Sequence, residues 1–139
     1  MHYYDRVVHH NWDAARINYD VGVVRLSKSL TLDGVHTKAV SLAYSLPAGN
    51  TRSTVTGWGY LDYNTKVTPT TLQKLTTYRY AGHSIYTPGS YSSIWDSRTQ
   101  VASFVASNKG ICMGDSGGPL VVGDAGEQYG VCSYVLTRK

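Results

Sequence analysis

Residues 110–120 read Gly110-Ile111-Cys112-Met113-Gly114-Asp115-Ser116-Gly117-Gly118-Pro119-Leu120, with four glycines around one serine hydroxyl. Glycine adopts positive φ angles and lets backbone N–H groups come close to a bound atom. A serine hydroxyl is a poor nucleophile unless a base takes its proton and fixed donors stabilise the charge formed on the attacked carbonyl. We therefore predict Ser116 to be a nucleophile, with the N–H groups of Gly114 and Ser116 as an oxyanion hole. The alternative is an ordinary glycine-rich turn.

The run Gly-Asp-Ser-Gly-Gly-Pro-Leu at 114–120, with Cys112 four residues before the serine, resembles the nucleophile loop of the chymotrypsin/trypsin-like serine proteases. Similar stretches extend from about Tyr4 to Leu136, and their residue pattern resembles that of arthropod digestive chymotrypsin-like enzymes. The resemblance implies an all-β fold, a chymotrypsin-like double antiparallel β-barrel. It also implies a serine endopeptidase that works through an acyl-enzyme and needs no cofactor or metal.

An acid stands in the apolar segment Asn18–Leu26, which we predict to be a strand. Burying a lone carboxylate is costly unless it is hydrogen-bonded, so Asp20 is expected to have partners. The segment is similar to the family strand that carries the triad aspartate. The resemblance implies that Asp20 orients a histidine and stabilises its imidazolium form, and that Ser133 hydrogen-bonds to Asp20.

Two parts of the family's machinery have no match in the sequence. The family histidine lies roughly 45 residues before the aspartate, so we expect it upstream of Met1. His9 and His10 match a non-catalytic turn instead. The family's activation terminus, whose ammonium group pairs with the acid matching Asp115, has no counterpart either. Asp115 is therefore expected to be an activation-switch residue without its partner, and the chain alone is expected to be inactive.

The chain has 139 residues, whereas two-barrel all-β proteins run to roughly 200–250. We therefore expect an incomplete barrel pair. Turn-forming groups between Ser27 and Asn50 predict a connection between barrels. Residues 1–46 are predicted to be the remnant of the first barrel and the interdomain connection. Residues 47–139 are predicted to be the second barrel, lacking its last strand and C-terminal helix.

Apolar and polar residues alternate in several other short segments, which predicts further strands. Trp58 lies in a Gly-Trp-Gly corner, where we expect the indole to plug a barrel while the glycines let backbone pass closely. Residues 84–96 are expected to hold one short helix and a surface loop. The further predicted strands are Arg6–His9, Ser53–Tyr60, Leu72–Tyr80, Pro119–Val122 and Gln128–Tyr134.

The resemblance also predicts a specificity pocket. In the family the residue six before the serine sets the pocket floor, and Gly110 there supplies no acid to bind Lys or Arg. Val135 takes the place of a pocket-mouth glycine, where a branched side chain favours small or medium apolar residues. Met113 and Tyr134 complete the predicted pocket, and Tyr134 belongs to an edge against which an extended substrate pairs through its main chain.

The two cysteines do not form a disulfide framework that can be derived from the sequence. The resemblance places Ser53 and Val122 where family members carry a bridge. It also implies that Cys112 is unpaired here, with its family partner near or beyond Lys139. A bridge between Cys112 and Cys132 stays an alternative, and a free buried thiol is the simpler interpretation of Cys132.

The formal net charge is +4, and Lys and Arg are spread along the chain, which disfavours nucleic acid and membrane surfaces as partners. The resemblance implies a secreted, extracellular protein. The partners that it implies are polypeptide substrates, protease inhibitors and the missing N-terminal part of the same protein. Two alternatives remain open: a catalytically inactive homologue that binds proteins through its substrate groove, and a truncated gene product.

Overall fold

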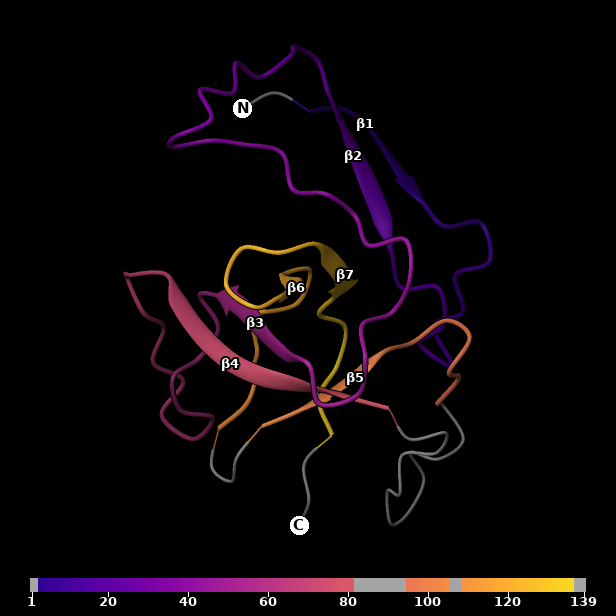
Figure 1. Ribbon diagram of the computed structural model, residues 1–139, viewed down its shortest axis with the longest axis vertical. Helices are drawn as coiled ribbons and strands as arrows, with labels where there is room; N and C mark the ends of the chain where they lie inside the picture. The colour runs from indigo at the N-terminus through magenta and orange to yellow at the C-terminus, as the bar shows by residue number, and fades with distance from the viewer. Residues whose placement is uncertain (1–2, 82–94, 106–108, 137–139) are drawn as a thin grey trace.

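The computed structural model describes residues 3–81, 95–105 and 109–136 (Figure 1). All of the regular secondary structure in these residues is β-strand. The all-β prediction is thus confirmed, and the strands curl into the half-barrel expected of an incomplete double barrel. The predicted helix at 84–96 lies almost wholly outside the described residues. The strands are β1 (Tyr3–Val8), β2 (Gly22–Leu26), β3 (Arg52–Gly57), β4 (Gln73–Tyr80), β5 (Ala102–Phe104), β6 (Pro119–Val122) and β7 (Gln128–Val131).

Five of the strands form one antiparallel sheet in the order β5-β4-β3-β6-β7. Its centre is β3, where Val55 pairs with Leu75 on β4 and with Leu120 on β6. Val55 and Leu120 are buried, and burying such a side chain contributes about 1.5–3 kcal/mol. The nucleophile loop runs directly into β6, so this core supports the loop from its C-terminal end.

Polar side chains fill much of this sheet's interior, and each needs a hydrogen-bond partner to be buried without penalty. Ser53 is fully buried and pairs with Val122 across β3 and β6, at the two positions where the resemblance placed a disulfide. The Tyr129 hydroxyl donates to Ser53 Oγ at 2.7 Å, and Ser53 Oγ donates to the Thr51 carbonyl at 3.2 Å. A hydroxyl chain therefore joins β7, β3 and the preceding turn at this place.

The other sheet is a two-stranded antiparallel pair of β1 and β2, which lies apart from the five-stranded sheet in Figure 1. Its valines Val7, Val8, Val23 and Val24 are each more than half exposed. Consecutive residues of a strand point to opposite faces, so both faces of the pair are apolar and exposed. A two-stranded pair of this kind is at best marginally stable by itself.

The long connection after β2 contacts the larger sheet before it enters β3. Leu42 forms a parallel bridge to Gln128 of β7, where the Ala43 N–H donates to the Gln128 carbonyl and the Gln128 N–H donates to the Ser41 carbonyl, both at 2.9 Å. Part of the predicted 1–46 unit therefore lies against the second sheet. The boundary at residues 46 and 47 stays a prediction. Among the described residues no helix is long and apolar enough to cross a membrane.

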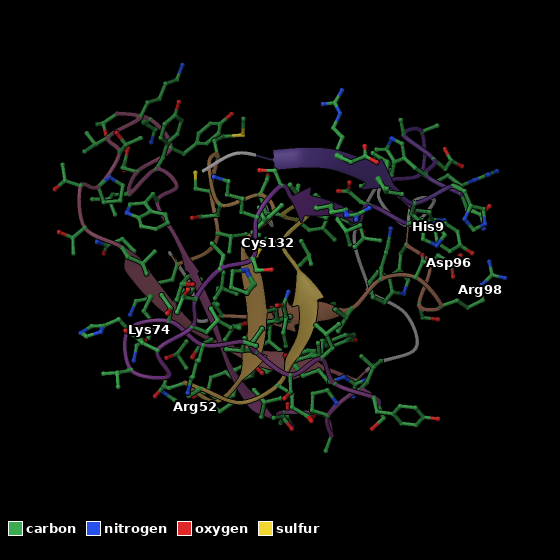
Figure 2. All side chains as sticks on the ribbon, turned by 90° about the horizontal axis from the view of Figure 1, so that it is seen from above. His9, Arg52, Lys74, Asp96, Arg98 and Cys132 are labelled. Carbon is green, nitrogen blue, oxygen red and sulfur yellow. The ribbon has the colours of Figure 1, made fainter. Side chains whose placement is uncertain are left out.

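Asp124, in the turn between β6 and β7, binds side chains of two neighbouring strands. Its carboxylate accepts from Arg52 and Lys74 at 3.3 Å and from the Thr54 hydroxyl at 3.0 Å, and Arg52 and Lys74 lie on the same side of the molecule (Figure 2). The Thr54 hydrogen bond, then the one from Lys74, lowers the pKa of Asp124. This carboxylate therefore links β3, β4 and the β6–β7 turn.

We expect Asp124→Asn to lower the urea midpoint of unfolding at neutral pH and to change it much less in acid. The pKa of Asp124 is lower in the folded than in the unfolded state, so its stabilisation is present above the unfolded pKa and is lost as pH falls through the folded pKa. Urea titrations of both proteins between pH 7 and strongly acidic solution measure the difference. Glu127→Gln removes the same charge from the same turn as a control, and an equal, pH-independent difference for both variants contradicts the prediction.

Candidate active site

Ser116 is exposed at the tip of a tight turn just before β6. The glycines on either side of it have positive φ angles, 101° at Gly114 and 81° at Gly117, a region that other residues rarely adopt. The Gly118 N–H closes the turn by donating to the Asp115 carbonyl at 3.0 Å. The local sequence therefore dictates this loop, and it presents the predicted nucleophile to solvent.

The carboxylate of Asp115 is bound by two backbone amides. The Gly59 N–H donates to Oδ1 and the Cys112 N–H donates to Oδ2, each at 2.8 Å. We expected an acid without its partner, and the structure shows that the backbone supplies two donors. These bonds attach the nucleophile loop to the corner after β3.

Trp58 does not plug a barrel, and the expectation that it does is wrong: its side chain is 56% exposed. The carboxylate of Asp115 occupies the inner side of the corner instead. A Cβ added at Gly57 would lie 2.1 Å from Asp115 Oδ1, and one at Gly59 would lie 2.4 Å from its Cγ. Both glycines face this acid, and because alternate residues of an extended chain point to opposite sides, the indole between them points outward.

Three segments that are distant in the sequence meet beside the nucleophile loop. Gly117, directly after the nucleophile, donates its N–H to the Cys132 carbonyl, and the Cys132 N–H donates to the Gly118 carbonyl, both at 2.8 Å. Ser133, the next residue, donates its hydroxyl to Oδ2 of Asp20. The structure thus brings Ser116, Ser133 and Asp20, the residues predicted to be the nucleophile, the aspartate's support and the orienting acid, into one continuous chain of neighbours.

Asp20 lies in a turn before β2, not inside a strand as predicted. Ile17 and Tyr19 have φ angles of 53° and 55°, which interrupt the extended backbone. Asp13 and Asn18 exchange two backbone hydrogen bonds at 3.1 Å and close the preceding turn, and the Val21 N–H donates to the Tyr19 carbonyl at 2.8 Å around Asp20. Asp20 is exposed, and its carboxylate has the hydrogen-bond partner that was expected, Ser133. Exposure leaves the carboxylate accessible to a further donor.

His9 stacks on Tyr19 of this turn and on His10. The His9 ring lies 4.7 Å from the ring of Tyr19 and 4.7 Å from that of His10, and His9 Nδ1 accepts the Asn11 N–H at 3.1 Å. The bond that the structure gives to the Asp20 carboxylate comes from a serine instead. In the described ranges no three His, Cys, Asp or Glu side chains gather in a way that would hold a metal ion.

The family model called Trypsin matches residues 1–139, the whole chain. The chain belongs to the trypsin family. It is 33% identical over 126 residues to trypsin delta of Drosophila melanogaster, which covers 91% of this chain and 48% of that protein. It is 33% identical over 137 residues to chymotrypsin-like elastase family member 1 of Bos taurus, covering 93% of this chain and 50% of that protein. The chain spans about half the length of the curated relatives that it matches.

The residues predicted for a trypsin-family specificity pocket differ in exposure. Gly110, Met113 and Val135 are exposed, and a Cβ added at Gly110 would have no atom within 4 Å. Tyr134 is half-buried, and its hydroxyl donates to Gln100 Oε1 at 3.0 Å. Of these four residues, Tyr134 is thus the one whose side chain is held by a hydrogen bond in the structure.

Sequence reasoning missed Gln100. Its side chain contacts Tyr134 and also the turn that carries Asp20, through the Ile17 carbonyl and Asn18 Oδ1. No local motif marks this glutamine, because its partners lie far away in the sequence. The structure buries Asn18 in this turn, and its side-chain oxygen needs a partner there.

Both cysteines of this trypsin-family chain are free thiols. Burial raises the pKa of the Cys132 thiol, and the negative charge of Asp115 raises it further. The thiolate is the reactive form of cysteine. Cys132 is therefore held protonated behind the nucleophile loop.

We expect alkylation of Cys132 by iodoacetamide at pH 8 to be several-fold slower in the native protein than in concentrated urea. The Cys112→Ser variant isolates this reaction, and loss of free thiol over time measures its rate. The Cys132→Ser variant, which reports on Cys112, serves as the control. Equal native and urea rates for Cys132 would show that neither burial nor Asp115 protects the thiol.

Proposed function

We propose that this chain is the nucleophile-bearing part of a secreted serine endopeptidase. The observation that carries the proposal is the assembly in which Ser116 and Asp20 are brought together through Cys132 and Ser133. An aspartate fixed by a serine hydroxyl beside an exposed nucleophile is the arrangement that a Ser-His-Asp triad requires. Membership of the trypsin family gives the reaction class, acyl transfer to serine followed by hydrolysis.

In this mechanism Ser116 Oγ attacks the peptide carbonyl while a histidine takes its proton. Asp20 accepts the other ring N–H of that histidine and stabilises the imidazolium. We propose that the histidine comes from sequence outside these 139 residues, as the resemblance implies. The negative charge on the attacked oxygen is stabilised by the N–H groups of Gly114 and Ser116, next to a glycine whose φ of 101° fixes the direction of the peptide units.

Asp115 is proposed as the activation switch. Its carboxylate is held by Gly59 and Cys112 amides on the inner side of the corner. An ammonium group that binds there adds a charge-assisted bond to the same carboxylate. Such a bond would stabilise the loop that presents Ser116, whereas the chain without it stays inactive.

The proposed substrates are polypeptides with small or medium apolar residues before the cleaved bond. Gly110 supplies no carboxylate for a Lys or Arg side chain, and Val135 narrows the predicted mouth. Protease inhibitors that present an extended segment to the Tyr134 edge are partners of the same kind.

The N-terminal part of the same protein is the proposed partner of the β1–β2 pair. Apolar valines are exposed on both faces of the pair, and an open surface hollow of about 280 Å³ is lined by residues 7–10 and 21–23. Covering such surfaces contributes about 25 cal/mol per Å² of apolar area. Val23→Asp in the protein encoded by the full reading frame would then reduce the folded yield, while Val35→Asp in an exposed turn would not.

A fluorophosphonate probe tests the proposed function. In the protein encoded by the full reading frame, activated by limited tryptic cleavage, we expect stoichiometric labelling that Ser116→Ala abolishes. The 139-residue chain alone is expected to stay unlabelled, because the base is missing. Absence of labelling in the activated protein would instead favour an inactive homologue, and labelling of the isolated chain would overturn the assignment of the base to outside sequence.

A further inference from the structure

We propose that Gln100 is a positioning residue that couples the orientation of Asp20 to that of Tyr134. The proposal rests on the proposed function, in which Asp20 orients the catalytic base and Tyr134 borders the bound substrate. Gln100 precedes β5 in the chain, and neither the family motif nor the nucleophile loop includes it.

The side-chain amide of Gln100 uses both of its ends. Nε2 donates to the Ile17 carbonyl and to Asn18 Oδ1, each at 3.0 Å. Oε1 accepts the Tyr134 hydroxyl at 3.0 Å. A primary amide has two donor hydrogens and one oxygen with two lone pairs, so these bonds use both hydrogens and one lone pair. A single side chain therefore contacts the Asp20 turn on one side and the Tyr134 ring on the other.

These contacts close a ring. Ser133 and Tyr134 are consecutive residues; the first bonds directly to Asp20 and the second bonds to Gln100. Gln100 in turn binds Ile17, three residues before the aspartate. Because both connections join the same two segments, neither segment can rotate without straining the other bond. A shift of the Tyr134 ring is therefore transmitted to the turn that carries Asp20.

The turn that carries Gln100 is itself fixed. The Gln100 N–H donates to the Asp96 carbonyl at 2.9 Å, and the Asp96 N–H returns a bond to Gln100 Oε1 at 3.1 Å. Arg98 pairs with Asp96 at 2.7 Å, and its hydrogen bonds lower the pKa of Asp96 to about 2. Hydrogen bonds from Thr99 and Gln100 to Asn18 place this turn against the segment around Asp20. Thr99 adds a second link, from its hydroxyl to Asn18 Oδ1 at 3.2 Å.

Burial makes these bonds matter. Asn18 is only 9% exposed, and the Tyr134 hydroxyl is on a half-buried ring. Buried polar groups that lose a partner are penalised more than exposed ones, which water can satisfy. An apolar residue at position 100 would leave the Ile17 carbonyl and the Tyr134 hydroxyl to find new partners, while the Asn18 oxygen would keep the Thr99 hydroxyl. The bond between Ser133 and Asp20 would then be the direct link between the two segments, and the Tyr134 ring would no longer be coupled to the Asp20 turn through position 100.

A double-mutant cycle in the activated protein of the full reading frame tests the coupling. With an apolar peptide amide as substrate, we expect Gln100→Met to lower kcat about 10- to 100-fold, the range that misplacing a reacting group produces. Tyr134→Phe should lower kcat a few-fold in the wild-type background and have no further effect on kcat beside Gln100→Met. Additive effects on kcat, or effects confined to KM, overturn the proposal. Gln73→Met, at a glutamine on β4, is the matched control.

Amide chemical shifts supply a second measurement, which needs no activity. In the same protein, Tyr134→Phe should move the Gln100 side-chain amide signal and the backbone amides of residues 17–21. In the Gln100→Met background the backbone shifts should vanish. If the activated protein is inactive but this pattern is found, the proposed function fails and the coupling stands. If residues 17–21 do not respond to Tyr134→Phe, the coupling fails whatever the activity.

Discussion

Replacing Asp20 by asparagine is expected to lower kcat of the activated protein about 10⁴-fold, the magnitude known for this exchange in a Ser-His-Asp triad. Asparagine has nearly the shape of aspartate and can still accept the hydroxyl proton of Ser133. The exchange removes the negative charge that stabilises an imidazolium, and the amide favours the wrong tautomer of the histidine. The loss therefore falls on the chemical step and not on the fold.

Hydrolysis of a peptide amide by the wild type and the Asp20→Asn variant measures this effect, with far-UV circular dichroism to verify that both are folded. Asp33→Asn is the matched control, because Asp33 is an exposed acid of a surface turn that accepts backbone amides and the His36 ring. We expect that variant to keep its activity. A loss of less than tenfold for Asp20→Asn would mean that Asp20 is not the orienting acid.

Replacing Gly59 by alanine is expected to destabilise the protein by about 2–4 kcal/mol. The added Cβ would lie 2.4 Å from both Cγ and Oδ2 of Asp115, so the carboxylate must move. Its movement breaks the bonds from the Gly59 and Cys112 amides, and both groups lie in a partly buried place. The corner after β3 and the nucleophile loop would then separate.

Urea unfolding of wild type and Gly59→Ala measures the change in free energy, and amide hydrogen exchange at Cys112 reports whether its bond to Asp115 is lost. Gly110→Ala is the control within the same loop, because a Cβ at that position would meet no atom within 4 Å. We expect that variant to unfold within ~0.5 kcal/mol of the wild type. Similar unfolding of Gly59→Ala and Gly110→Ala would contradict the steric argument.

The parts of the fold that the sequence predicted correctly are those with local signals. The predicted strand Pro119–Val122 is β6 itself, and Leu72–Tyr80 differs from β4 by one residue. The Gly-Asp-Ser-Gly-Gly loop could be predicted because two of its glycines, Gly114 and Gly117, adopt the positive φ angles that favour glycine. The alternation of apolar and polar residues and the preferences of turn-forming residues act over a few positions, so a single sequence is enough to read them.

The errors came from effects that act between distant segments. Apolar alternation predicted one strand from Asn18 to Leu26, but Ile17 and Tyr19 adopt positive φ angles that alternation cannot report. The outward direction of Trp58 depends on the acid that comes to the corner from the nucleophile loop. Gln100 was missed for the same reason, because tertiary packing brings its partners Ile17 and Tyr134 to it from distant parts of the sequence. The roles assigned to the site residues stay predictions.

The parallel bridge between Leu42 and Gln128 has a consequence for solubility. In the described part of the chain the five-stranded sheet ends at β7 and β5, and sheet edges are templates on which other chains can add strands. Residues 41–43 cover β7 along part of its length. The opposite border, β5, has three residues, too few for a long intermolecular ladder. The connection between the two sheets therefore also covers part of an edge on which another chain could otherwise add a strand.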